Sequence, residues 1–235
     1  MSGERAAMEI EAGRWRARLT GAEGAAGALA LRSLVFRGGP SDRDAFDAAA
    51  RHLMIEDASG TVHACARLSV QDSAGIRAGY AAQFYDLTAF SSRFARALEV
   101  GRLCHRPGAT DPDVPRLLLA VIARVVEAAG AEVLYGCSSF PAEAAALGRL
   151  ADRIAPDGWR PGRKAAETVP LTGEGGTLPP LLRSYLSLGA RVSDHGVVDR
   201  DLGTVHVFTG LPIAEIPPVR ARLLTGMLAT PVAAD

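Results

Sequence analysis

The chain has 235 residues, of which 48% are hydrophobic and 22% are charged. This is the composition of a folded globular protein, and the length is sufficient to bury a proper core. The formal net charge is zero, so no overall electric field would draw the chain to nucleic acid or to a membrane surface. We therefore expect no nucleic-acid partner.

The three cysteines, Cys65, Cys104 and Cys137, are far apart and show no spacing typical of metal ligands. This pattern predicts neither a disulfide framework nor a zinc site, and we expect no metal. The N-terminal residues contain no apolar segment typical of a secretion signal. The longest apolar run, at 117–123, is too short to span a bilayer. A cytoplasmic protein is expected.

Residue patterns in the first half of the chain predict strands with two helices. Strands are indicated by alternation or short apolar runs, and helices by an apolar face with a glycine or proline beyond its end. In chain order, the predicted elements are a strand at 15–19, a helix at 22–36, strands at 52–57, 61–70 and 83–87, and a helix at 91–97. The turn at 57–60 is typical of a hairpin. The loop after the first helix contains Asp42, Asp44 and Asp47, and helix capping accounts for only one or two of them.

The second half of the chain continues the alternation of strands and helices. The predicted elements are a strand at 98–104, a helix at 114–129, a strand at 131–138, helices at 142–154 and 178–188, strands at 197–198 and 205–209, and a tail helix at 219–228. The strand–helix–strand unit from 98 to 138 predicts two parallel strands joined by a right-handed crossover. We expect a single α/β domain over residues 1–235, with its core at about 14–212 and a tail at 213–235.

The strand at 98–104 carries Glu99 and Arg102, three residues apart in an apolar segment. In a regular strand these side chains point to opposite faces, and Gly101 between them is typical of a bulge. A strand interior rarely contains two charges without a reason, because burying an unpaired charge is costly. On residue types alone, a structural ion pair between Glu99 and an arginine is favoured over a catalytic role.

Several short motifs follow one another in a defined order. They are Arg-Ser-Leu-Val-Phe at 32–36, Asp-Ala-Phe-Asp at 44–47, His-Leu at 52–53, Arg-Leu at 67–68, Glu-Val-Gly-Arg at 99–102, Tyr-Gly-Cys-Ser-Ser-Phe at 135–140, Leu-Pro-Pro-Leu-Leu at 178–182, Tyr-Leu-Ser-Leu-Gly-Ala at 185–190 and Asp199. This set resembles the ornithine–acyl carrier protein N-acyltransferases, which are relatives of the acyl-homoserine-lactone synthases within the GNAT-like acyltransferase fold. The segments 64–68, 105–108 and 202–206 depart from the pattern of that family.

The resemblance implies a GNAT-like mixed central sheet flanked by helices. It also implies transfer of a 3-hydroxyacyl chain from an acyl carrier protein thioester to the α-amine of L-ornithine, which gives lyso-ornithine lipid without a metal or other cofactor. Glu99 would be the general base, with Gly101 and Arg102 beside it at the catalytic edge. The residues implied in substrate binding are Arg32, Phe36, Asp44, Asp47, Arg67, Ser138 and Ser139.

Two alternatives remain open at this stage. The chain could acylate another amine from an acyl carrier protein, as homoserine-lactone synthases do, or it could be a non-catalytic module that binds lipid or the carrier. The segment 106–113 lacks the glycine pattern that cradles the pyrophosphate of coenzyme A and carries two aspartates, which favours a carrier protein as acyl donor.

Two surface contacts are also expected. The basic group from Arg149 to Lys164, together with Trp159, could receive an acidic carrier protein, although a solvated arginine-rich face explains it equally well. Because the product would be a lyso-lipid, we expect peripheral contact with the inner membrane, with the helix at 219–228 as a candidate for it.

Overall fold

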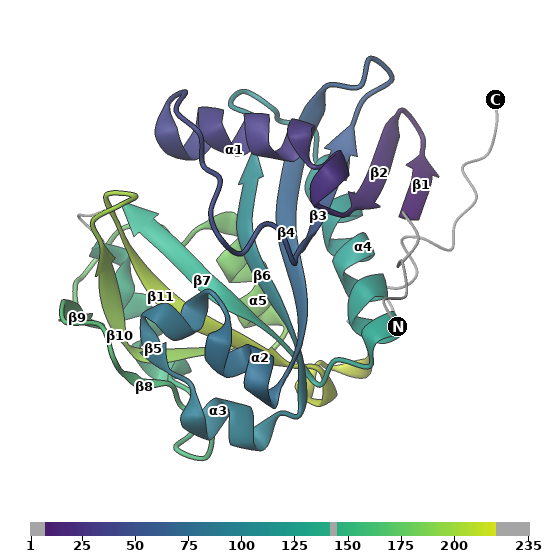
Figure 1. Ribbon diagram of the computed structural model, residues 1–235. Helices are drawn as coiled ribbons and strands as arrows, with labels where there is room; N and C mark the ends of the chain where they lie inside the picture. Colours follow the sequence, from purple (N-terminus) through teal and green to yellow (C-terminus); the bar gives the residue numbers. More distant parts are fainter. Residues whose placement is uncertain (1–7, 142–144, 220–235) are drawn as a thin grey trace. The chain divides into compact units, whose positions relative to one another are not determined.

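The computed structural model describes residues 8–141 and 145–219 (Figure 1). The chain clusters into two compact units. Within the described residues, the first contains 8–69 and 100–129, and the second contains 70–99, 130–141 and 145–219. Two strands, β4 (Val62–Asp72) and β6 (Arg96–His105), each contribute residues to both units.

The first unit is built on an antiparallel sheet. Its strands are β1 (Met8–Ala12), β2 (Trp15–Thr20), β3 (Arg51–Glu56) and most of β4. The pairs β1–β2, β2–β3 and β3–β4 are all antiparallel. The turn predicted between β3 and β4 is present: Asp57 N–H donates to Thr61 O at 3.1 Å, and Gly60 has a φ of 81°, a left-handed conformation that favours glycine.

Two helices bury β3 on both of its faces. They are α1 (Ala26–Arg37), which follows the 3₁₀ turn η1 (Ala22–Gly24), and α4 (Asp113–Ala129). Met54 of β3 packs in an apolar cluster with Ala28 and Leu31 of α1. Successive side chains of a strand point to opposite faces, so the neighbours of Met54 face the other side, where α4 packs.

The second unit has a mixed sheet in which β7 is an interior strand. Its strands are the first part of β6, β7 (Val133–Pro141), β9 (Thr168–Pro170), β10 (Arg191–Asp199) and β11 (Thr204–Pro212). The β7 strand pairs parallel with β6 through 97–99 and antiparallel with β11, and β10 lies between β11 and β9. The predicted parallel pair is therefore confirmed.

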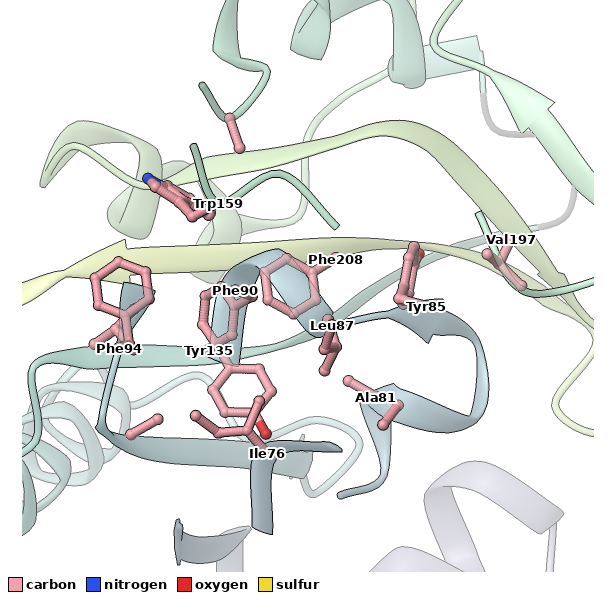
Figure 2. Close-up of a cluster of buried hydrophobic side chains, with 14 residues drawn as sticks. Ile76, Ala81, Tyr85, Leu87, Phe90, Phe94, Tyr135, Trp159, Val197 and Phe208 are labelled. Atoms are coloured by element: carbon pink, nitrogen blue, oxygen red, sulfur yellow. The ribbon is translucent and has the colours of Figure 1, made fainter. Parts of the chain in front are cut away.

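Aromatic side chains form the core of the second unit (Figure 2). The Phe90 ring of α3 (Thr88–Arg93) lies 5.0 Å from the ring centroids of both Tyr135 and Phe208. Ile76 of α2 (Ser73–Ala78) is fully buried in the same cluster. These contacts place α2 and α3 over one face of β7 and β11, because Tyr135 and Phe208 extend from that face.

Smaller elements complete the second unit. They are η2 (Ala81–Gln83), β5 (Tyr85–Asp86), η3 (Ala145–Arg153), β8 (Gly162–Arg163), α5 (Pro180–Ser187) and η4 (Ile213–Glu215). The prediction that 83–87 extends the main sheet is wrong, because β5 pairs with β8 in a separate two-stranded sheet. The helix expected at 142–154 is a 3₁₀ helix over its described part.

The α/β class is confirmed, with several shifts in element boundaries. The helix expected at 22–36 is divided into η1 and α1, and the short helix expected at 91–97 begins at Thr88 and ends at Arg93. The strands β1, β8 and β9 and the helix α2 were not predicted. Apart from its first residue, Val219, the predicted tail helix lies outside the described residues, and the single-domain boundaries stay a prediction.

Candidate active site

Arg32 is the centre of a buried network of arginines and aspartates in the first unit. Its side chain is 1% exposed although it lies on α1, one residue after the core residue Leu31. Its Nε donates to Asp42 Oδ2 at 2.9 Å, and its Nη1 donates to Asp47 Oδ1 at 2.6 Å. A buried guanidinium requires this kind of compensation, and the loop after α1 supplies it.

Asp42 receives three arginines, and its side chain is fully buried. Besides Arg32, its carboxylate accepts from Arg37 Nε at 3.1 Å and from Arg102 Nε at 2.9 Å. Arg32 and Arg37 belong to α1, and Arg102 belongs to β6. One carboxylate thus connects the end of α1 to the second half of β6.

Arg67 of β4 connects the other two aspartates of the loop. Its Nη1 donates to Asp44 Oδ1 at 2.5 Å and to Asp47 Oδ1 at 3.2 Å, and its guanidinium lies 5.5 Å from the centroid of the Phe46 ring. The Asp44 side chain is 23% exposed, whereas that of Asp47 is 3% exposed. Of the three aspartates, Asp44 therefore has the side chain with the most solvent contact.

The charges in the network set the ionisation of Asp47. Burial alone would raise the pKa of Asp47, but hydrogen bonds from Arg32 and from the Asp44 N–H, together with the positive charges of Arg32 and Arg67, lower it to about 2. Asp47 therefore remains a carboxylate at any physiological pH. It is a fixed negative charge inside the network.

The backbone of β6 is irregular at Arg102. This residue has a φ of 50°, which makes it the single non-glycine residue with a positive φ among the described residues. Such a conformation costs of order 1–3 kcal/mol and persists where surrounding contacts impose it. The contacts here are the hydrogen bond to Asp42, an ion pair of Arg102 Nη2 with Asp44 at 3.4 Å, and the Phe36 ring, whose centroid lies 5.8 Å from the guanidinium.

Glu99 is held in the second unit by N–H groups. Its side chain is on β6, and the residue is 5% exposed. Oε1 accepts from Ala81 N at 2.8 Å, and Oε2 accepts from Tyr80 N and from Gln71 Nε2, both at 3.1 Å. The carboxylate thus caps the first N–H groups of η2 and has a fixed orientation.

Comparisons with known proteins identify the family of the chain. Residues 33–120 match the family model described as Acetyltransferase (GNAT) domain. A protein named L-ornithine N(alpha)-acyltransferase from Rhodobacter capsulatus is 31% identical over 187 residues, which are 71% of this chain and 72% of that protein. The chain belongs to the family of L-ornithine N(alpha)-acyltransferases. A protein of the same name from Brucella abortus is 29% identical over 203 residues, covering 74% of this chain and 71% of that protein.

A solved structure described as TofI in an apo form has a TM-score of 0.51 to this chain at 18% identity, and the match covers 94% of this chain and 99% of that one. This likeness concerns the fold alone. With the GNAT-domain match it confirms the predicted GNAT-like α/β class. Family membership makes the protein an acyltransferase, so the non-catalytic alternative is set aside.

The structure brings together most of the predicted site residues of this acyltransferase. Arg32, Asp44, Asp47, Arg67 and Arg102 are members of one network in the first unit, and Phe36 contacts it through Arg102. Gly101 lies beside it, since a Cβ added to it would lie 3.6 Å from Arg67 Nη2. The catalytic and binding roles of these residues, and of Glu99, stay predictions.

The predicted serines lie on β7 in the second unit. Ser138 Oγ is 2.9 Å from Thr209 Oγ1 of β11, and Ser139 is exposed. Their role in lining an acyl tunnel stays a prediction. The expectation that Trp159 receives a carrier protein at the surface is wrong, because its ring is 4% exposed and packs against Phe90 and Phe94 at centroid distances of 5.8 Å.

Two residues of these clusters were missed by sequence reasoning. Asp42 was treated as one of the capping residues of the loop, although a third aspartate beyond the number that caps require was a usable signal. Gln71 gave no signal, because a glutamine at the end of a strand has no distinctive pattern. Within residues 8–141 and 145–219, no group of three or more His, Cys, Asp or Glu side chains is arranged to hold a metal ion.

Proposed function

We propose that this acyltransferase transfers a 3-hydroxyacyl chain from an acyl carrier protein thioester to the α-amine of L-ornithine, giving lyso-ornithine lipid. The observation that carries the proposal is the match to proteins named L-ornithine N(alpha)-acyltransferase over more than two thirds of both chains. The name of those relatives indicates L-ornithine as the acceptor. Two groups of side chains suit that reaction: the arginine–aspartate network around Arg32, and Glu99 with its hydrogen-bond donors.

The reaction forms an amide bond and breaks a thioester bond. The neutral amine attacks the thioester carbonyl, the C–N bond forms, the C–S bond breaks, and the thiol leaves with one proton. Glu99 accepts the proton from the attacking amine, directly or through a water, and releases it again after the step. The oriented carboxylate described above supports this role because a general base must be fixed relative to the proton that it takes.

The arginine–aspartate network supports an amino-acid acceptor with a second ammonium group. Arg32 already engages Asp42 and Asp47 in full burial, so we assign it to holding the loop in place. Asp44 has the most exposed side chain of the three aspartates, at 23%, and its charge suits the side-chain ammonium of ornithine. The guanidinium of Arg102, which forms an ion pair with Asp44, suits the α-carboxylate of ornithine.

The beginning of α4 supports a carrier protein rather than coenzyme A as the acyl donor. Asp111 Oδ1 accepts from the Asp113 N–H at 2.9 Å, so a carboxylate of the chain itself occupies one of the N–H groups at this helix start. Asp113 adds a second carboxylate that is 66% exposed. A pyrophosphate bound at a helix N-terminus would be repelled by both charges.

An assay with purified components tests the proposal. The full chain is incubated with 3-hydroxyacyl carrier protein and L-ornithine, and the product is identified by mass spectrometry. We expect one amide at the α-nitrogen and little product when acyl-coenzyme A replaces the carrier. Product formed only with another amine would refute the ornithine assignment, and equal rates with coenzyme A would refute the donor assignment.

Substitution of Asp44 tests the acceptor contact. We expect Asp44→Asn to raise the KM for ornithine by about tenfold or more, since it removes a charge-assisted contact. The matched control is Asp152→Asn, which changes a carboxylate that is 74% exposed. An unchanged KM in Asp44→Asn would contradict this assignment.

We also propose that the protein is cytoplasmic and contacts the inner membrane peripherally, because a lyso-lipid product partitions into a bilayer. Among the helices within the described residues, none has the length and apolar character needed to cross a membrane. The full chain should co-sediment with vesicles of anionic lipid and with vesicles of neutral lipid. Absence of the protein from both pellets would contradict membrane contact.

A further inference from the structure

A chain of hydrogen bonds runs through the second unit from β7 to Glu99. The Tyr135 hydroxyl donates to Gln71 Oε1, and Gln71 Nε2 donates to Glu99 Oε2 at 3.1 Å. Tyr135 is fully buried, with its ring stacked on Phe208 at a centroid distance of 5.5 Å (Figure 2). The aromatic core thus holds Tyr135, at one end of this series of hydrogen bonds, in a fixed position.

The direction of each hydrogen bond in this chain follows from the groups involved. An ionised carboxylate only accepts hydrogen bonds, so the amide of Gln71 must present its NH₂ group to Glu99 and its carbonyl to Tyr135. The hydroxyl of Tyr135 must then be the donor. Burial, reinforced by the charge of Glu99, raises the pKa of Tyr135 well above its ordinary value, so the donor keeps its proton at physiological pH.

Gly79 shows how closely these groups are packed. A Cβ added at this position would lie 2.7 Å from Gln71 Nε2, 2.9 Å from Glu99 Oε2 and 3.2 Å from the Tyr135 hydroxyl. The first two distances are shorter than real Cβ contacts. The backbone of Gly79 therefore lies directly against the junction of the three polar groups, and a methyl group there would displace the ends of the Gln71 and Glu99 side chains.

We propose that Gln71, oriented by Tyr135, is a positioning residue that sets the orientation and proton affinity of Glu99 in acyl transfer. This inference rests on the proposed role of Glu99 as the base. Among the described contacts, Tyr135 of β7 is the titratable group that faces Glu99. The neutral Gln71 of β4 and the backbone N–H groups of Tyr80 and Ala81, at the start of η2, complete its surroundings.

The substitution Gln71→Glu tests the proposal because it keeps the shape of the side chain but replaces the N–H donor that faces Glu99 by a negatively charged acceptor. Two adjacent carboxylates share a proton, and the apparent pKa of the pair rises. We expect the acidic limb of the kcat/KM profile against pH to move upward by about one unit or more, since two carboxylates in one site interact at least that strongly. A residue that contributes only packing would not move this limb.

Tyr135→Phe is the second variant, and it keeps the proposal testable if Gln71→Glu does not fold. It removes the hydroxyl that fixes the amide, so the acidic limb should shift in the same direction by a smaller amount, with a several-fold lower kcat. Tyr185→Phe is the matched control, because the buried Tyr185 hydroxyl has no hydrogen-bond partner among the described residues. It should keep the wild-type profile.

An acidic limb that stays at the wild-type pH in the folded variants would overturn the inference. The profiles are measured with whichever amine and acyl donor the wild-type protein uses best. If that amine is not ornithine, the proposed acceptor fails, yet the comparison of variants still decides the role of Gln71. The two proposals therefore fail by different results.

Discussion

His206 of β11 makes the stability of the fold sensitive to acid. The residue is 1% exposed, its Nδ1 lies 3.1 Å from the Tyr85 hydroxyl, and the Phe84 ring is 4.8 Å from it. Burial lowers the pKa of His206 from 6.5 to about 4, despite an opposing effect of Asp199. Protonation of the ring would therefore place a charge inside an aromatic core.

The sign and size of the effect follow from linkage. Unfolded His206 takes up a proton near pH 6.5, whereas the folded ring stays neutral down to about pH 4. Its contribution to stability is therefore complete above pH 6.5 and is lost as the pH falls toward 4. A difference of 2.5 units corresponds to about 3 kcal/mol, and most of it is lost by pH 4.5.

Urea denaturation at several pH values between 7 and 4.5 measures this loss. Over this range, the free energy of unfolding should fall further in the wild-type protein than in His206→Phe. The two losses should differ by about 2–3 kcal/mol. Tyr85 keeps a partner in the variant, because its hydroxyl also donates to His206 O at 3.0 Å. Parallel curves for the two proteins would refute the reasoning.

Three further predictions concern the two clusters. Arg102 has a φ of 50°, a conformation that glycine adopts with less strain than alanine. In urea denaturation, the free energy of unfolding of Arg102→Gly should therefore be about 1 kcal/mol higher than that of Arg102→Ala. The reverse order would contradict the backbone strain. Asp47→Asn removes the carboxylate that Arg32 and Arg67 share, while each keeps one other aspartate. It should lower the free energy of unfolding by about 1–3 kcal/mol, and an unchanged free energy would show that the shared carboxylate is dispensable. Gly79→Ala should reduce the rate of acyl transfer by about tenfold or more, because the added methyl group displaces Glu99. The control Gly158→Ala should keep wild-type activity, since its added Cβ meets no described atom within 4 Å. Equal rates in the two variants would contradict the close packing at Gly79.

Long elements with a strong pattern were predictable from the sequence. The helix α4 has an apolar face over 17 residues, and β7 is a nearly continuous apolar run, so their type and order were evident. The short α2 has six residues and begins where Asp72 accepts from the Gly75 N–H at 2.8 Å. Such a segment is too short to show helical periodicity, so only the folded context reveals it.

The candidate site was predictable in residue type but not in connectivity. The motifs indicated Asp44, Asp47 and the arginines as a polar network, and the structure confirms that they contact one another. The sequence could not show that Glu99 would be held by backbone N–H groups, because backbone donors leave no mark on residue identity. The contact of Gln71 with Glu99 joins residues 28 positions apart and depends on the packing of two strands.

The three arginines on Asp42 also have a consequence for how the chain can change over time. A single substitution at Asp42 would leave the guanidinium groups of Arg32, Arg37 and Arg102 without their shared acceptor. Changes at these positions should therefore be non-additive, so that a loss at Asp42 is partly relieved by a second loss among the arginines. We expect this position to accept new residues mainly through paired substitutions, which makes it a point of epistasis in the first unit.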